Sequence, residues 1–251
     1  MADQETIKIY HIEGRRSLRV IWICEELYIP YELVFEKGNL MASLEKIIRV
    51  NPFVPLAPTV EFRGKVLVES GAIIELLQTY YGNGRLAPNI DSDDYAYYLQ
   101  WLHFAEGTMM YRQWALRYAA MTAGIPISQM PIGHTADGVN SGLVGIRAVF
   151  DFLESYLCNR EYFAGSKFSA ADIMMHYAIK VAPIVSEFDY RNFEHLQNWL
   201  ALVESRPAFK RAMESAVPGG YNKYGLPKEQ ALPFGEPDLS GFAPMPTCLT
   251  H

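Results

Sequence analysis

The spacing of apolar side chains divides this chain into two parts with different patterns. In residues 5–85, short runs rich in β-branched and aromatic residues alternate with segments whose apolar positions recur at helical spacing. The pattern predicts strands at 6–11, 31–35, 59–62 and 65–68, and helices at 17–27, 40–50 and 70–80. This α/β order, βαβαββα with a hairpin near its end, is the order that a thioredoxin-like domain requires.

The second part is predicted to be all-helical. A polar stretch at 85–94, which contains Pro88, indicates a linker. Helices are expected at 95–114, 143–157, 170–185 and 193–213, and a loop or broken helix at 124–138. The first of these helices carries one stripe formed by Tyr95, Tyr98, Leu99, Leu102, His103, Glu106, Met109 and Met110. We therefore expect an all-helical domain over 94–222, followed by an extended proline-rich tail over 223–251.

Composition and charge exclude several classes of protein. Half of the 251 residues are hydrophobic, so disorder is not expected over most of the chain. The net charge is −6 and there is no long run of Lys and Arg, which argues against a nucleic-acid partner. Every apolar stretch is soon interrupted by charge, and the amino terminus is polar, so neither a membrane span nor a signal peptide is expected. Cys24, Cys158 and Cys248 are few and far apart, which indicates free thiols and a cytoplasmic location.

The first candidate site is the segment Ala57-Pro58-Thr59-Val60 at the start of the predicted hairpin. Proline cannot donate a ladder hydrogen bond, so part of the neighbouring backbone must stay unpaired. If the Ala57–Pro58 bond is cis, the amide and carbonyl of Ala57 face outward and offer an edge to an extended peptide. The structural alternative is an ordinary edge-strand proline.

The second candidate is Glu69-Ser70, where a predicted strand gives way to a predicted helix. The amide and hydroxyl of Ser70 lie at the positive end of that helix and suit a carboxylate. Glu69 suits an ammonium group, so the pair fits the α-amino and α-carboxylate groups of a γ-glutamyl unit. The alternative is that Ser70 only caps the helix.

The third candidate is the turn after the first strand, Tyr10-His11-Ile12-Glu13-Gly14-Arg15-Arg16-Ser17. A thiol held at a helix amino terminus near arginine has a lowered pKa and is a better nucleophile at neutral pH. A solvated basic turn is the competing explanation. By contrast, Phe168-Ser169-Ala170-Ala171-Asp172 has the pattern of a capping box, so Asp172 is expected to be structural.

Taken in order, these segments resemble the glutathione transferase superfamily, and the likeness covers about residues 6–222. The motifs that carry it are Ala57-Pro58-Thr59-Val60, Glu69-Ser70-Gly71-Ala72, Gly84-Arg85-Leu86-Ala87-Pro88, Trp101-Leu102-His103-Phe104-Ala105-Glu106-Gly107, Phe163-Ala164-Gly165 before the capping box, and Ser205-Arg206-Pro207-Ala208-Phe209. The middle motifs are similar to a fungal and bacterial branch. The resemblance implies that glutathione binds through Glu69 and Ser70 at its γ-glutamyl end and through the Ala57 backbone at its cysteinyl unit. It also implies a homodimer.

The chain departs from the family at the position that stabilises the thiolate. Relatives carry a hydroxyl, Cys or Asn four or five residues before the arginine matched by Arg19, where this chain has Gly14 and Arg15. Our order of candidates is Ser17, then Arg15 or the Gly14–Arg16 backbone, then Tyr10. Arginine suits the role because it stays charged and supplies several donors.

The second substrate is expected to be a small hydrophobic molecule. Side chains that continue the first long helix are expected to line an apolar cleft facing Gly14: Met110, Tyr111, Trp114, Arg117 and Tyr118, with His176 and Tyr177 from a later helix. A core role is the alternative for each of them. The six histidines show no metal-ligand spacing, so no metal site is expected.

The sequence thus predicts a glutathione transferase that activates the bound thiol for attack on an electrophile. One alternative is a glutathione-dependent double-bond isomerase in a specialised biosynthetic pathway, in which the thiolate adds, allows rotation and leaves. Another is a non-catalytic regulatory module that keeps only the glutathione site. Product analysis separates the first two, and binding without turnover would favour the third.

Overall fold

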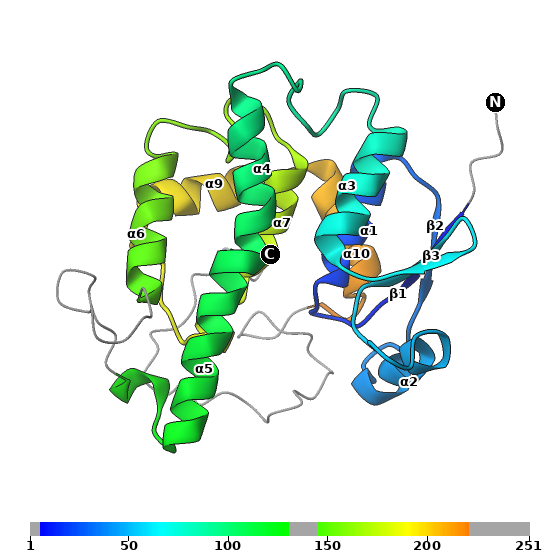
Figure 1. The fold of residues 1–251 in the computed structure, drawn as a ribbon, viewed down its shortest axis with the longest axis horizontal. Coiled ribbons are helices and arrows are strands. Elements are labelled where there is room, and N and C mark those ends of the chain that lie inside the picture. Colours follow the sequence, from blue (N-terminus) through cyan, green and yellow to red (C-terminus); the bar gives the residue numbers. More distant parts are fainter. Residues whose placement is uncertain (1–5, 131–144, 221–251) are drawn as a thin grey trace.

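The structure is a computed structural model that describes residues 6–130 and 145–220 of the chain (Figure 1). A sheet with its helices forms one side of the molecule, and a group of helices forms the other. The predicted fold class, a thioredoxin-like domain followed by an all-helical domain, is confirmed. The predicted tail at 223–251 lies outside the described residues, and the domain boundaries near residues 85–94 remain a proposal.

The sheet has four strands in the order β2-β1-β3-β4. The strands are β1 (Ile7–Tyr10), β2 (Tyr31–Val34), β3 (Thr59–Phe62) and β4 (Lys65–Leu67). β1 runs parallel to β2 and antiparallel to β3, and β4 closes the hairpin with β3. Tyr10 is paired with Thr59, so the ends of β1 and the start of β3 lie side by side. The loops that follow β1 and precede β3 therefore meet at one edge of the sheet.

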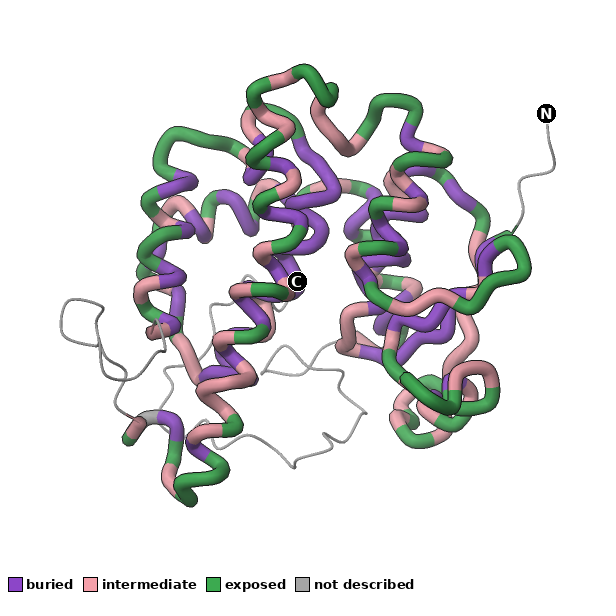
Figure 2. The backbone as a smooth tube through the Cα atoms, viewed as in Figure 1, coloured by how far each residue is buried: buried purple, intermediate pink, exposed green. Residues whose placement is uncertain are grey.

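Three helices cover the two faces of this sheet, α1 (Ser17–Leu27), α2 (Leu40–Val50) and α3 (Ser70–Tyr81). α1 and α3 share the core with Ile7 and Ile9, whereas α2 packs Ile47 against Tyr10 on the other face. Figure 2 shows that α1 is buried along most of its length, because the sheet, α3 and the helical domain surround it. The start of α1 is thus a junction between both domains.

The helical domain contains α4 (Asp94–Phe104), the π-helix η1 (Ala105–Met110), α5 (Tyr111–Ala123), the short 3-10 helix η2 (Ile127–Gln129), α6 (Ile146–Leu157), α7 (Ala170–Lys180), α8 (Ala182–Val185), α9 (Glu194–Glu204) and α10 (Pro207–Ala216). α7 packs against α1 and α4, and α10 packs along α1. These contacts join the two domains through a continuous apolar core. Of the predicted loop at 124–138, the residues beyond 130 lie outside the described part.

The helix predicted at 95–114 is helical throughout, but it contains the π-helical segment η1 and continues through α5 to Ala123. In η1 the amide of Tyr111 donates to the carbonyl of Glu106, five residues earlier, which is the π-helical pattern. The extra residue changes which positions after Phe104 share a face with α4. His103, which was placed on the apolar stripe, precedes η1 and is exposed. Such π-helical turns are frequent at functional sites. Here the turn carries Glu106 toward α1.

Two other predicted helices are broken at prolines. Residues 193–213 form α9 and α10, since Pro207 restricts Arg206 to an extended conformation and then starts a new helix. Residues 170–185 form α7 and α8, with Pro183 in the first turn of α8. Proline removes an amide donor and clashes with the preceding turn, so an uninterrupted helix is excluded at both places.

The capping box predicted at the start of α7 is confirmed. Ser169 and Asp172 cap each other, and Asp172 is fully buried. Its carboxylate also accepts hydrogen bonds from the amide of Phe163 at 3.0 Å and from the indole of Trp199 at 2.9 Å. Asp172 thereby ties α7 to the segment before it and to α9.

Within the described ranges, none of the helices combines the length and apolar character needed to cross a membrane. The same ranges contain no cluster of His, Cys, Asp and Glu suited to holding a metal ion. Cys24 is buried and Cys158 is exposed, and both are free thiols.

Candidate functional site

Three segments predicted to carry chemistry lie next to one another. The β1–α1 turn (residues 11–16) and the Ala57–Pro58 segment are neighbours because Tyr10 pairs with Thr59. The start of α3 joins them, since Arg19 in the first turns of α1 donates from Nη1 to the Ser70 hydroxyl at 3.0 Å. The thioredoxin-like topology thus brings together residues that are up to about 50 positions apart.

The Ala57–Pro58 peptide bond is cis, which is the condition under which the sequence predicted an outward-facing Ala57 backbone. The Thr59 hydroxyl donates to the carbonyl of Leu56 at 2.7 Å and fixes the chain just before the proline. Within residues 6–130 and 145–220, neither the amide nor the carbonyl of Ala57 has a hydrogen-bond partner. A short piece of extended backbone therefore remains open for pairing.

The start of α3 differs from an ordinary capped helix. Glu69 precedes it with φ of 70°, a left-handed backbone that non-glycine residues rarely adopt, and its side chain is exposed. Ser70 is buried, and its hydroxyl accepts a hydrogen bond from Arg19. No side-chain oxygen caps the first amides of α3, so the positive end of the helix is left unneutralised.

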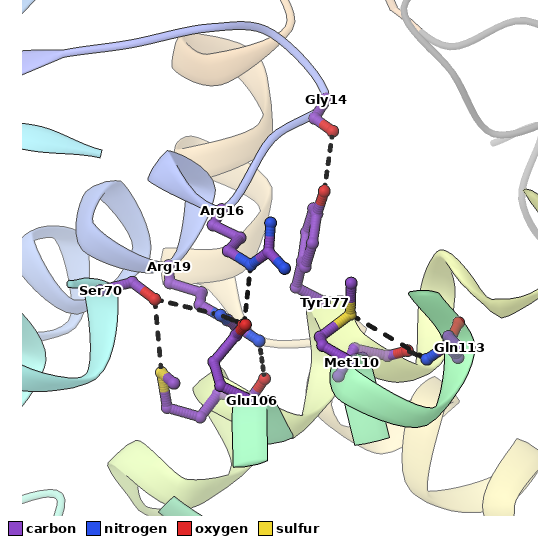
Figure 3. A network of polar contacts seen from close by, with 10 residues as sticks. Gly14, Arg16, Arg19, Ser70, Glu106, Met110, Gln113 and Tyr177 are labelled. Atoms are coloured by element: carbon purple, nitrogen blue, oxygen red, sulfur yellow. Dashed lines mark hydrogen bonds and ion pairs between the residues drawn. The ribbon is translucent and has the colours of Figure 1, made fainter. Parts of the chain in front are cut away.

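An ion-pair network of the buried Arg19 and the half-buried Arg16 and Glu106 lies behind Ser70 (Figure 3). Arg19 is only 1% exposed; it donates from Nη1 to Glu106 and from Nη2 to the carbonyl of Met174 at 2.7 Å. Arg16 donates from Nε to the same Glu106 oxygen at 2.8 Å. Burial alone would raise the pKa of Glu106, but the charges and hydrogen bonds of Arg19 and Arg16 lower it below its ordinary value. Two cations thus face one carboxylate, and positive charge remains beside Ser70.

The structure places Ser17, the first candidate for thiolate stabilisation, away from the surface of the turn. Ser17 is fully buried, and its oxygen lies 2.7 Å from Nδ1 of His11. Nε2 of His11 lies 2.7 Å from the carbonyl of Ala216 and must carry the proton, because a carbonyl only accepts. Nδ1 is then an acceptor and the Ser17 hydroxyl donates to it. The hydroxyl is therefore used inside the protein.

His11 was not singled out from the sequence, yet it connects the turn to the end of α10. It is fully buried, and burial lowers its pKa to about 4, with the Ala216 carbonyl opposing that shift. His11 is thus neutral at physiological pH. Its position after a strand gave no sign of this contact, because Ala216 is more than 200 residues away.

Tyr10, the third candidate, points to the opposite face of the sheet. Its hydroxyl donates to Glu61 Oε1 at 2.6 Å, and its ring packs near α2. Burial and the adjacent Glu61 raise the pKa of Tyr10 to about 12. A phenol with that environment is a poor source of a hydrogen bond for a thiolate.

The turn itself retains its donors. Arg15 is partly buried, its Nη1 donates to the Gly14 carbonyl at 3.3 Å, and its amide donates to Ile12. No side chain caps the start of α1, where Arg16 is the first flanking residue. Among the described residues, the amides of Gly14, Arg16 and Ser17 face no acceptor. Arg15 and the turn backbone, the second choice from the sequence, are therefore the donors that remain.

The predicted pocket residues separate into two groups. Met110 is 2% exposed, and its sulfur lies 4.0 Å from Nε2 of the buried Gln113, so it belongs to the core. Tyr111 and Tyr118 are exposed on α5, and Trp114 stacks on Tyr118 with 5.6 Å between ring centroids.

Three further residues named with the pocket have defined partners. Arg117 donates to the carbonyls of Ile184 and Val185, and His176 is buried against Glu204. Tyr177 does reach the turn, since its hydroxyl donates to the Gly14 carbonyl at 3.3 Å.

Sequence reasoning did not assign roles to the side chains of Arg16, Arg19 and Glu106. A charged residue within an apolar helix was the available signal, because Arg19 lies in a run of hydrophobic residues and Glu106 lies on the apolar stripe. Nothing in the sequence indicated the π-helical turn that places Glu106 beside α1.

Comparison with known proteins agrees with this architecture. A family profile described as "Glutathione S-transferase, N-terminal domain" matches residues 5–79, and one described as "Glutathione S-transferase, C-terminal domain" matches residues 117–207. The chain is 30% identical to the glutathione S-transferase-like protein OpS6 of Beauveria bassiana, covering 84% of this chain and 96% of that protein. It is 29% identical to Glutathione S-transferase 3 of Schizosaccharomyces pombe, covering 83% and 87%.

Solved structures share the fold. A delta-class glutathione transferase of Nilaparvata lugens aligns with a TM-score of 0.64 and 23% identity over 84% of this chain and 94% of that one. A glutathione transferase homologue from Sulfitobacter with bound glutathione aligns with a TM-score of 0.65 and 19% identity over 84% and 98%. With matching profiles for both domains and a relative 30% identical along nearly its whole length, this chain belongs to the glutathione S-transferase family.

Proposed function

We propose that this protein is a glutathione transferase that activates the glutathione thiol for attack on a small hydrophobic electrophile. The observation that carries the proposal is the meeting of three features at one edge of the sheet: the unpaired backbone of Ala57, the uncapped start of α3 and the uncapped start of α1. Each of these suits a different part of a γ-glutamyl tripeptide.

Glutathione docks as an additional strand along Ala57, whose amide and carbonyl pair with the cysteinyl unit. The γ-glutamyl carboxylate lies at the start of α3, where it accepts from the amide and hydroxyl of Ser70. Arg19 supports this site from behind, because a hydroxyl that accepts from a guanidinium is a stronger donor toward a carboxylate. The exposed Glu69 carboxylate pairs with the α-ammonium group.

The sulfur then lies at the start of α1, facing the β1–α1 turn. Amides of the turn and the Arg15 guanidinium favour the thiolate over the thiol, which lowers the thiol pKa. The thiol proton leaves to solvent, so no general base is required once that pKa is below about 7. The thiolate attacks the electrophile, the carbon–sulfur bond forms, and the leaving group departs with its electron pair.

The aromatic side chains of α5 are the proposed contact surface for the electrophile. Trp114 and Tyr118 form a stacked pair, and Tyr111 is exposed one turn earlier. We further propose a cytoplasmic homodimer. The names of the relatives and the glutathione bound to the Sulfitobacter homologue support glutathione as the thiol substrate.

The proposal is tested by turnover of a chlorinated nitroaromatic with glutathione, followed by mass spectrometry of the product. We expect a product that has gained glutathione and lost chloride. An isomerised product without glutathione, obtained with a conjugated cis-alkene, would favour the isomerase instead. Glutathione binding by calorimetry with neither product, over a panel of electrophiles, would favour a non-catalytic module.

A further inference from the structure

One hydroxyl from the helical domain reaches the turn at which the sulfur is proposed to lie. Tyr177, on α7, donates to the carbonyl of Gly14 in the β1–α1 turn (Figure 3). α7 packs against α1, so the phenol is delivered by the second domain to a turn built by the first. The contact brings a hydroxyl to the turn, and none of residues 11–16 carries one.

The hydrogen bond from Tyr177 to Gly14 is long, whereas the Tyr177 ring is buried and packed against two guanidinium groups. The donor and acceptor oxygens are 3.3 Å apart, beyond the usual 2.5–3.0 Å for such a bond. Tyr177 is only 8% exposed, and its ring lies 5.8 Å from the Arg16 guanidinium and 5.2 Å from that of Arg19. The phenol is thus fixed in place while its hydrogen remains available to a better acceptor.

The charges around the phenol favour an anionic acceptor. Arg16 and Arg19 face the Tyr177 ring, and Glu106 binds both of them with one carboxylate. These three side chains therefore carry one net positive charge. A thiolate placed at the turn would be attracted to that charge and would accept from the phenol.

The other two hydroxyls considered for this role have partners elsewhere. Ser17 donates to His11 inside the protein, and Tyr10 donates to Glu61 on the opposite face of the sheet. Both of those oxygen–oxygen or oxygen–nitrogen distances are short, at 2.6–2.7 Å. Neither hydroxyl is as free to exchange its acceptor as that of Tyr177.

We propose that Tyr177 is a catalytic residue whose hydroxyl donates a hydrogen bond to the sulfur of bound glutathione and stabilises the thiolate. The inference rests on the proposed function. No proton is transferred to or from Tyr177: the thiol proton goes to solvent, and the phenol keeps its own. The helical domain would then supply the hydroxyl that other members of the family carry in the first domain.

The test compares Tyr177→Phe with a control, Tyr97→Phe, which removes a phenol from the outer side of α4 while keeping its ring against Tyr156. The thiol pKa of bound glutathione is measured from thiolate absorbance as a function of pH. For Tyr177→Phe we expect that pKa to rise by about one to two units, and kcat/KM at neutral pH to fall about tenfold or more. Glutathione Kd should change less than about threefold, since the docking contacts are kept. An unchanged thiol pKa would overturn the inference.

A second variant guards against a structural effect of losing the Gly14 contact. 3-Fluorotyrosine introduced at position 177 keeps the ring and the hydroxyl, and fluorine makes that hydroxyl a stronger donor. We expect the thiol pKa to fall below the wild-type value, the opposite direction from Tyr177→Phe, which a purely structural role would not produce. If wild type conjugates glutathione but both variants keep its thiol pKa, this inference alone fails. If wild type does not bind glutathione, the proposed function fails with it.

Discussion

The starts of α7 and α1 are two solutions to the same physical problem, the unpaired amides at the first turn of a helix. At α7, Ser169 and Asp172 satisfy those amides and each other, and Asp172 also binds Phe163 and Trp199. At α1, no side chain caps the helix, and charged residues gather around it. A helix start whose amides are paired within the protein thus belongs to the core, whereas a start with unpaired amides is available to a ligand.

The largest expected loss of stability comes from removing the capping box at the start of α7. Asp172→Ala leaves the donors of Phe163, Ser169 and Trp199 buried without an acceptor, which should lower the free energy of unfolding by about 3–5 kcal/mol. Urea denaturation measures the loss. The folded fraction should bind glutathione with unchanged affinity, and a selective loss of glutathione binding would contradict the structural role.

The next effect is a dependence of the free energy of unfolding on pH, caused by His11, which joins the start of α1 to the end of α10. His11 has a pKa of about 4 in the folded protein against 6.5 as its ordinary value, so the unfolded chain binds a proton first as pH falls. Its contribution is complete above pH 6.5 and is lost progressively toward pH 4, by about 3 kcal/mol in total.

Measuring the unfolding free energy at several pH values for wild type and His11→Gln isolates this group. The variant should show a smaller dependence of the free energy of unfolding on pH between 4 and 6.5. Parallel curves would mean that His11 titrates normally and is not held neutral between Ser17 and Ala216. The comparison of two proteins cancels the contributions of other titrating groups, such as Glu204, whose pKa is lowered to about 2.

A smaller effect is expected at the start of α3, the second unsaturated helix end. Ser70→Ala removes the hydroxyl that accepts from Arg19, and it should weaken glutathione binding about 10- to 30-fold, or roughly 1.5–2 kcal/mol. Isothermal titration calorimetry gives Kd, and Ser92→Ala in the linker is a suitable control. Equal affinity in both variants would show that the γ-glutamyl carboxylate lies elsewhere.

The smallest expected effect is that of Tyr10→Phe, which tests whether Tyr10, rather than Tyr177, contacts the glutathione sulfur. Tyr10→Phe removes a hydrogen bond to Glu61, so the free energy of unfolding should fall by about 1 kcal/mol. The thiol pKa of bound glutathione should stay at the wild-type value. A rise in that pKa would mean that Tyr10 contacts the thiol, which would contradict its placement on the α2 face of the sheet.

Local patterns predicted the first domain well. The bounds of α1, α2 and β3 agree with the sequence prediction, and the other elements of the first domain differ by one residue at one or both ends. Those elements are short and separated by strong signals such as Pro30 and Gly64. The sequence also singled out the Ala57–Pro58 segment and the Glu69-Ser70 pair as candidates, because the chemistry proposed for each is contained in adjacent residues.

The proposed thiol end of the site could not be predicted in the same way. The residues that surround the β1–α1 turn come from η1 at Glu106, from α7 at Tyr177 and from the end of α10 at Ala216. A serine next to an arginine looked like a thiol ligand in the sequence, and only the contact with His11 explains its burial. Long-range contacts of this kind, and the π-helical turn, leave no local periodic signal.

The central claim is that glutathione docks across the Ala57 edge and the starts of α3 and α1. The most direct measurement is the melting temperature of the full chain as glutathione is raised to saturation. At about 100 times Kd, we expect a stabilisation of roughly 2.7 kcal/mol, which corresponds to a rise of roughly 5–10 °C. A melting temperature that does not move at saturating glutathione would show that glutathione does not bind the folded protein.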